Sequence, residues 1–272
     1  MSETVPFTGV PLSVQDCADE VGALRNQVFS GSWSCKLGTG TPLCIKSLFP
    51  GLKNKGMNAM IPGSSLKGML RNMVEMLGAG CTRYYVWNPQ KDKDDYPNLA
   101  SCTPARACIA CRLFGFVEGD FSWPGKVRIH DSSPAPAGWE SYQVAFDREP
   151  HHEDKGPGWI VFPCIPFTET PAKAGEICVS RSQNFIFRLD YRNLNAEEYA
   201  VLKFALTLKD EYCNLQLLHM LGYAKSLGFG ACLITIRDDK SPAIGAEINP
   251  YLKGLPFEEL EHWRKVENLH AQ

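Results

Sequence analysis

The chain lacks any apolar run long enough to span a lipid bilayer, for which about 20 consecutive apolar residues are needed. Its first residues, MSETVPFTGVPLS, carry neither the basic region nor the apolar region of a secretory signal. The number of cysteines, eleven, is odd. Together these features favour a cytoplasmic protein whose thiols are buried or metal-bound rather than paired as disulfides.

A strong net charge is also missing. The 28 Lys and Arg residues nearly balance the 30 Asp and Glu residues, which leaves a formal charge of −2. A protein coated in basic surface is therefore excluded, and binding to a nucleic acid would need a local patch. The length of 272 residues and the 44% hydrophobic content are sufficient for a sizeable buried core.

Acidic residues are absent between Glu20 and Glu75. Seven basic residues fall in the same stretch: Arg25, Lys36, Lys46, Lys53, Lys55, Lys67 and Arg71. Such a block is either a solvated face or a groove for a phosphate backbone, and the pattern leaves both interpretations open.

The sequence MIPGSSLKGMLRNMVE at residues 60–75 predicts an amphipathic helix. Apolar side chains recur at helical spacing at Leu66, Met69, Leu70, Met73, Val74 and Leu77. Lys67, Arg71 and Glu75 form the opposite column, and Ser64 is predicted to cap the N-terminus. A helix that opens on Pro-Gly-Ser-Ser beside two cations could also hold an anion there.

Strand patterns occur at 27–37, 126–130, 185–191 and 231–237. Asn195 and Glu198 form a capping box for a helix that carries residues 199–209. No internal repeat is visible, and strands and helices are interleaved along the chain. We therefore predict one α+β domain over 1–272 with insertions, of the ferredoxin-like type.

Two further segments have an expected form. Residues 132–160 are rich in Pro, Gly and charge, which predicts an extended hairpin or a long loop. Residues 248–272 resemble a short amphipathic helix, which could dock on this domain or on a neighbouring subunit.

Four cysteines carry the strongest local signal: Cys81, Cys102, Cys108 and Cys111, in the spacing C-x20-C-x5-C-x2-C. Four thiolates at such spacing can close a tetrahedral zinc site, which would be structural because no position is open to water. The alternative is four unligated thiols in a polar insertion. His130 is the substitute ligand if Cys102 does not reach the metal.

The stretch GYAKSLGFG (222–230) is a second candidate site. Its three glycines allow positive φ and a close approach of the backbone to a ligand. Lys225 and Ser226 add a cation and a hydroxyl suited to a phosphate. The order of a P-loop is absent, and a tight connection before a strand is the alternative reading.

Catalytic pairs are not evident. His151 and His152 lie in the loop-like segment, and no base accompanies Asp131 or Asp147. His219 sits in the apolar run LQLLHML, which is typical of a core histidine.

Three motifs in this order resemble the RAMP superfamily of CRISPR–Cas proteins: IPGSSLKGMLR (61–71), CIACRLFGF (108–116) and LGYAKSLGFG (221–230). The resemblance runs from about Val28 to Ile236. It is specifically to the Cas-seven-like backbone subunits of type III effector complexes. FDR (146–148) resembles the point where that family begins its thumb.

The resemblance implies an RRM-like core, several copies stacked along a CRISPR guide RNA in antiviral defence, and other Cas effector subunits as partners. It implies zinc in a cysteine-rich insertion, here 78–116, and a thumb within 132–160 between guide and target RNA. By position, RNA contacts fall on the helix start, the basic block and the Gly-rich loop: Ser64, Ser65, Lys67, Arg71, Lys53, Lys55, Lys225, Ser226, Gly228 and Gly230.

One departure from the family pattern concerns cleavage. RNA-cleaving relatives place a catalytic aspartate in the loop after the first strand, whereas residues 38–60 contain no carboxylate. Such a loop cannot bind a divalent cation or act as a base there. We therefore predict guide-directed RNA binding without cleavage. One alternative is a ribonuclease of the same superfamily, either a metal-dependent enzyme that cleaves target RNA or a guide-processing enzyme with His130 or His219 as base. The other is a zinc-stabilised scaffold that binds only proteins.

Overall fold

The computed structural model describes the following residues: 8–11, 29–45, 59–75, 77, 86–88, 93–95, 102–103, 107–133, 138–144, 158–161, 171–172, 175–210, 215–237 and 239–240. The predicted tail helix at 248–272 lies outside them, as do Lys53, Lys55 and Cys81. Among the residues described, no helix combines the length and the apolar character needed to cross a membrane.

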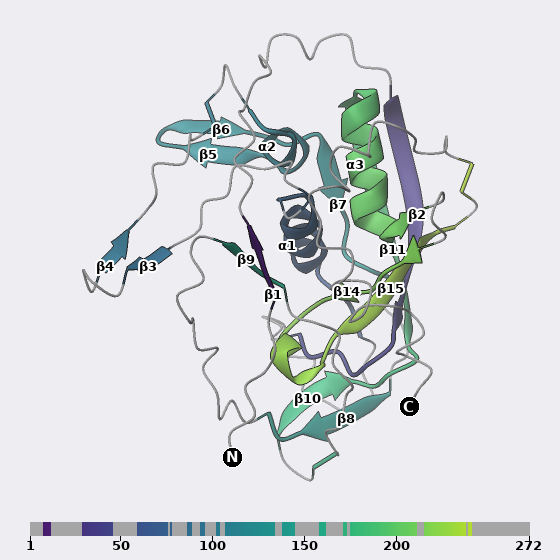
Figure 1. Ribbon diagram of the computed structural model, residues 1–272. Coiled ribbons are helices and arrows are strands. Elements are labelled where there is room, and N and C mark those ends of the chain that lie inside the picture. Colours follow the sequence, from purple (N-terminus) through teal and green to yellow (C-terminus); the bar gives the residue numbers. More distant parts are fainter. Residues whose placement is uncertain are drawn as a thin grey trace.

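A five-stranded antiparallel sheet forms the centre of the molecule (Figure 1). Its strands follow the order β14 (His219–Met220), β15 (Ala231–Ile236), β2 (Phe29–Thr39), β11 (Asn184–Leu194) and β7 (Val127–Ile129). The two longest strands, β2 and β11, pair with Phe187 opposite Cys35 and Leu189 opposite Trp33. Each strand predicted from the sequence is present, with ends shifted by a few residues.

One face of the sheet is covered and the other is not. On β11 the side chains of Phe185, Phe187 and Leu189 are buried, while the intervening Arg188 is exposed. The helices α1 (Gly63–Val74) and α3 (Ala196–Thr207) contact one another and the sheet over the buried side chains. A period-two pattern of this kind is expected where a sheet has one packed and one open face.

The central elements follow the chain as β2, α1, β7, β11, α3 and β15, a β-α-β-β-α-β order. The last strand of this series lies beside the first, because β15 pairs with β2. The prediction of interleaved strands and helices is therefore confirmed, and the sheet is antiparallel throughout its described pairs.

Smaller antiparallel pairs surround this centre: β1 (Thr8–Pro11) with β9 (Gly158–Val161), β3 (Val86–Asn88) with β4 (Lys93–Asp95), β5 (Phe116–Glu118) with β6 (Phe121–Trp123), β8 (Trp139–Tyr142) with β10 (Glu176–Val179), and β12 (Lys209–Asp210) with β13 (Leu215–Gln216). Strand β8 lies within the segment 132–160, and β9 begins in it. They pair with β10 and β1 and not with each other, so these two strands do not form the predicted hairpin.

Cys44 and Cys178 are joined as a disulfide. Their neighbours Leu43 and Val179 exchange two backbone hydrogen bonds of 2.8 and 2.9 Å, which sets the two cysteines side by side. The prediction that no cysteines pair is therefore wrong for these two, which are separated by 134 residues in the sequence. Five other cysteines are buried as predicted: Cys35, Cys102, Cys108, Cys111 and Cys232.

A buried carboxylate, Glu198, connects three parts of the fold. It completes the predicted capping box of α3 with Asn195. Its two oxygens also lie 2.7 Å from Arg112 Nε and 2.7 Å from Lys126 Nζ. Arg112 belongs to the short helix α2 (Ile109–Phe114), and Lys126 precedes β7. Burial lowers the pKa of Lys126, and the hydrogen bond to Glu198 opposes that shift.

Replacing Glu198 with Ala is expected to lower the free energy of unfolding by about 3–5 kcal/mol, because the buried Arg112 and the half-buried Lys126 lose their carboxylate. Urea denaturation of the full chain measures the loss. The control is Glu197→Ala in the same first turn of α3, which is less buried and should cost less than about 1 kcal/mol. Similar costs for the two variants would contradict the connecting role of Glu198.

Candidate functional site

The start of α1 is fixed by the end of β7. Asp131 Oδ1 accepts a hydrogen bond of 2.7 Å from the Gly63 N–H, and Ile61 exchanges two bonds with Ser132. A Cβ on Gly63 would lie 2.4 Å from the Ile129 carbonyl oxygen, so only glycine fits this approach. The short spacing between helix and strand therefore explains the Pro-Gly that opens the helix.

The expected N-terminal cap of this helix is wrong. Pro62 occupies the N-cap position, and Ser64 lies inside the first turn. The N–H groups of Ser65 and Leu66 donate to the Pro62 carbonyl, and that of Gly63 donates to Asp131. These three N–H groups are therefore not available to donate hydrogen bonds to a phosphate. Ser64 was predicted to supply the side-chain acceptor at this helix start. Asp131, which lies 68 positions from Gly63 in the sequence, supplies it instead.

The side chains of this turn are still presented at the surface. Ser64 is exposed, and Ser65 and Lys67 are half-buried. Burial, together with the charge of Arg71, lowers the pKa of Lys67. An anion bound beside Lys67 would oppose that shift, because it would compensate the lost hydration of the ammonium group.

Arg71 makes its contacts within the protein. Its Nε lies 2.8 Å from Glu75 Oε1, Nη1 donates to the Gly115 carbonyl at 2.7 Å, and Nη2 lies 3.6 Å from Cys111 Sγ. Burial opposes the charge on Arg71, but Glu75 and Cys111 together raise its pKa. Burial raises the pKa of Glu75 even though Arg71 opposes it. Arg71 thus connects α1 to α2 and to Gly115, which directly follows α2.

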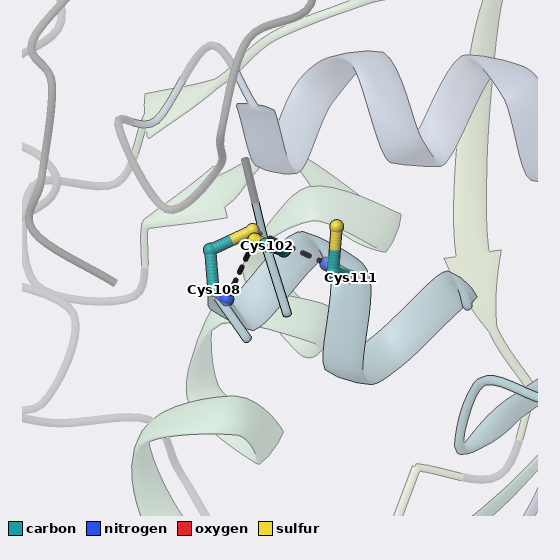
Figure 2. Close-up of side chains that lie close together, drawn as sticks. All are labelled: Cys102, Cys108 and Cys111. Atoms are coloured by element: carbon teal, nitrogen blue, oxygen red, sulfur yellow. Dashed lines mark hydrogen bonds between the residues drawn. The ribbon is translucent and has the colours of Figure 1, made fainter. Parts of the chain in front are cut away.

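Three of the four predicted metal ligands are brought together at that point. The sulfur atoms of Cys102, Cys108 and Cys111 lie within 4.8 Å of one another, and all three residues are buried (Figure 2). Three sulfurs of a tetrahedral zinc site would be about 3.8 Å apart, as Zn–S bonds of about 2.3 Å require. The described part of the cluster therefore has the composition and the spacing to hold a metal ion.

Backbone N–H groups point at these sulfurs. The Cys108 N–H donates to Cys102 Sγ at 3.3 Å, and the Cys111 N–H donates to Cys108 Sγ at 3.4 Å. Such donors and the nearby Arg71 suit the negatively charged sulfur ligands that a bound metal would have. Cys81, the predicted fourth ligand, lies outside the described residues. His130 does not join the cluster, because its Nε2 lies 2.8 Å from Asp190 Oδ2.

The Gly-rich loop packs on the segment that follows β2. Gly222, Gly228 and Gly230 all adopt positive φ, as predicted. The Gly230 N–H donates to the Pro42 carbonyl at 2.9 Å, and Thr41 Oγ1 donates to the Gly228 carbonyl at 2.8 Å. A Cβ on Gly230 would lie 1.8 Å from the Leu221 carbonyl oxygen. Tight packing of the loop against this segment is therefore sufficient to explain why glycine occupies these positions.

Lys225 is half-buried in this loop, and burial lowers its pKa. The side chain of Ser226 is outside the described residues. The loop lies beside β8 and β10, with Phe229 packed edge-on against Tyr142 at 5.4 Å between ring centres. The start of α1 instead contacts β7, at the opposite edge of the sheet from β14 and β15. The two predicted RNA-contacting groups are thus held by different parts of the fold.

The candidate bases are both engaged. His219 is buried, with Nε2 2.9 Å from the Leu206 carbonyl oxygen, which confirms it as a core histidine. His130 is partly exposed and pairs with Asp190. Sequence reasoning missed Arg112 and Glu198 as a pair. The one indication of this pair in the sequence was Arg112, a basic residue inside the CIACR motif. Its partner Glu198 lies on α3 and can be identified only from the fold.

The cysteine cluster predicts a specific effect on bound metal. Replacing both Cys108 and Cys111 with Ser should reduce the metal content of the purified chain from about one ion to near zero, because two thiolate ligands are removed. The control is Cys35→Ala, since burial raises the pKa of that core thiol to about 12 and keeps it protonated. Elemental analysis of both variants measures the outcome. The metal site would be contradicted if the Cys108/Cys111 variant held as much metal as the Cys35 control. It would also be contradicted if a chelator left the unfolding temperature of the wild-type chain unchanged.

In the comparison with known proteins, one family model matches most of the chain. The family model described as the RAMP superfamily matches residues 38–232. No curated protein matches the chain. Among solved structures, a chain of a "Type IV-B CRISPR Complex" is 14% identical with a TM-score of 0.43, covering 79% of this chain and 94% of that one. Csc2 of Thermofilum pendens is 14% identical with a TM-score of 0.40, covering 95% and 84%.

These structural similarities are too weak to support an argument, whereas the family match spans α1, α2 and the Gly-rich loop. All three motifs that suggested the family lie within the matched residues. The chain belongs to the RAMP superfamily.

Proposed function

We propose that this protein is a guide-RNA-binding backbone subunit of a type III-like CRISPR effector complex in the cytoplasm, acting with other Cas subunits in antiviral defence. The single observation that carries the proposal is the family match over residues 38–232, which contains all three motifs in their expected order. The central β-α-β-β-α-β order, with β15 beside β2, supports the proposal of a ferredoxin-like, RRM-like core.

RNA would be held by its backbone. The side chains of Ser64, Ser65 and Lys67 stand at the start of α1, which follows a stretch without acidic residues from Gly38 to Met60. Hydroxyl and ammonium groups there suit phosphate and ribose oxygens. The remaining proposed contacts come from the loop before α1 and from the Gly-rich loop: Lys53, Lys55, Lys225, Ser226, Gly228 and Gly230. Sequence would then be read by pairing of the guide with target RNA, not by the protein.

Arg71 has a different proposed part from its neighbours. Its donors contact Glu75, Gly115 and Cys111, so it would position the helix against the cysteine cluster while adding positive charge to the surface. A zinc ion held by Cys102, Cys108, Cys111 and the predicted Cys81 would be structural, because four protein ligands leave no open position. The ion would fix the insertion 78–116 to α1, and the thumb would come from 132–160.

Cleavage is not part of the proposed function. The described residues 38–45, which include the end of the central strand β2 and the segment after it, carry no carboxylate, and neither does the rest of the sequence up to Met60. A metal-assisted attack on RNA needs such a ligand, and an acid–base mechanism needs a positioned base. We propose that this subunit binds guide and target RNA without cutting them.

Substitution of Lys67 and Lys225 with Ala tests the proposal. Binding of labelled guide-length RNA should weaken about tenfold, and the slope of log Kd against log salt should fall by about 0.7 for each phosphate that is no longer neutralised. Lys209→Ala is the matched control, because Lys209 is exposed and lies on β12, outside the proposed surface.

Fluorescence polarisation at several salt concentrations gives both quantities. Folded, metal-replete wild-type protein that binds no RNA would reject the proposal and favour a protein-only scaffold. Equal affinity of the Lys67/Lys225 variant and the Lys209 control would show that RNA binds elsewhere on the chain.

A further inference from the structure

The uncovered face of the central sheet contains a cleft of about 520 Å³ that lies across three neighbouring strands. Its exposed or half-exposed polar side chains on β2, β11 and β7 are Ser30, Ser32, Arg128, Arg188, Asp190 and Arg192, and the lining also includes Lys126, which is paired with Glu198, and the buried Tyr191. We propose that this cleft, called here the arginine cleft, is a second binding surface for single-stranded RNA, which it contacts through the phosphates. The inference rests on the proposed function, and it adds a surface that none of the three motifs includes.

The strand register places the arginines on one face. Asp190 lies opposite Ser32 on one side and opposite Arg128 on the other, so all three side chains project from the uncovered face. Arg188 and Arg192 lie two residues before and after Asp190 on the same strand and therefore share this direction. Arg128, Arg188 and Arg192 are all exposed, and the Arg188 side chain retains 65% of its accessible surface.

The charge of the cleft is positive after its internal pairs are taken into account. Asp190 accepts from Arg188 Nε at 2.5 Å and is paired with His130 Nε2 at 2.8 Å. Partial burial opposes its ionisation, but these two hydrogen bonds hold the pKa of Asp190 below its usual value. Within the described ranges, no ion pair involves Arg128 or Arg192. The cleft thus offers two unpaired guanidinium groups and a third that shares one carboxylate.

The spacing of the arginines favours a polyanion over a small anion. Arg188 and Arg192 are four residues apart on one strand, which separates their Cα atoms by about 13 Å. A single phosphate ion cannot contact both groups, whereas consecutive phosphates of one strand can. A guanidinium group can donate two parallel hydrogen bonds to the oxygens of one phosphate. The hydroxyls of Ser30 and Ser32 add donors for a ribose or a phosphate.

The position of the cleft favours RNA over an acidic protein segment. The cleft adjoins the proposed RNA contacts at the start of α1, because His130, which pairs with Asp190 in the cleft, directly precedes the Asp131 that holds the start of α1. One strand of RNA could therefore follow the edge of β7 onto the sheet. The aromatic residue Tyr191 in the lining is buried, and none of the exposed side chains described in the cleft carries a ring on which a base could stack. Contact would therefore be to the backbone and independent of sequence.

The test uses the full chain with Arg128 and Arg192 both replaced by Ala, which leaves the contacts of Asp190 with His130 and Arg188 in place. Binding of a fluorescein-labelled oligouridylate should weaken about tenfold, and the salt slope should fall by about 1.4, as expected when two phosphates are no longer neutralised. The control R181A/K209A removes two exposed positive charges outside the cleft and should bind like wild type. Thermal unfolding of both variants confirms that they are folded.

The Lys67/Lys225 variant, measured in parallel, separates this inference from the proposed function. If that variant no longer binds while R128A/R192A behaves like its control, the arginine cleft is rejected and the proposed function stands. If neither variant differs from its control, both proposals fail. If wild type binds labelled polyglutamate and R128A/R192A is impaired only in that binding, the cleft is a protein-docking surface and the inference is overturned.

Discussion

The fold depends on one buried carboxylate. Glu198 accepts from the backbone at the start of α3 and lies within 2.7 Å of both Arg112 and Lys126. It therefore holds the second large helix, the cysteine-bearing helix α2 and the strand β7 in a single arrangement. The buried Arg112 and Glu198 require this geometry, because either of them without its partner would remain desolvated and unpaired, and the half-buried Lys126 adds a second positive charge. A hydrophobic core could stabilise the same elements without fixing their relative positions so tightly.

A second connection extends this arrangement to the helix that carries the proposed RNA contacts. Arg71 reaches from α1 to Gly115 and Cys111 of the α2 segment. The cysteine cluster thus lies between the charged network of Glu198 and the exposed side of α1. A metal ion bound there would stabilise the position of Lys67 through contacts one helix turn away, without touching RNA itself. Metal binding and RNA binding are expected to be coupled for this reason.

Local patterns in the sequence were sufficient for some of these features. The alternation in 185–191 and the capping box of Asn195 and Glu198 depend on near neighbours, and both are found as predicted. The helix at 63–74 also follows from its apolar spacing, but its cap does not, because Asp131 comes from the end of another strand. The Arg112–Glu198 pair and the Cys44–Cys178 disulfide join residues far apart in the sequence, so only the tertiary pairing reveals them.

The most direct measurement for the central claim is ultraviolet crosslinking of the protein to RNA within its native complex, followed by sequencing of the crosslinked peptides. The account predicts crosslinks to the start of α1, residues 61–71, and to the Gly-rich loop, residues 221–230. A native complex that contains RNA but gives crosslinks only to its other subunits would contradict the claim that this protein holds the guide.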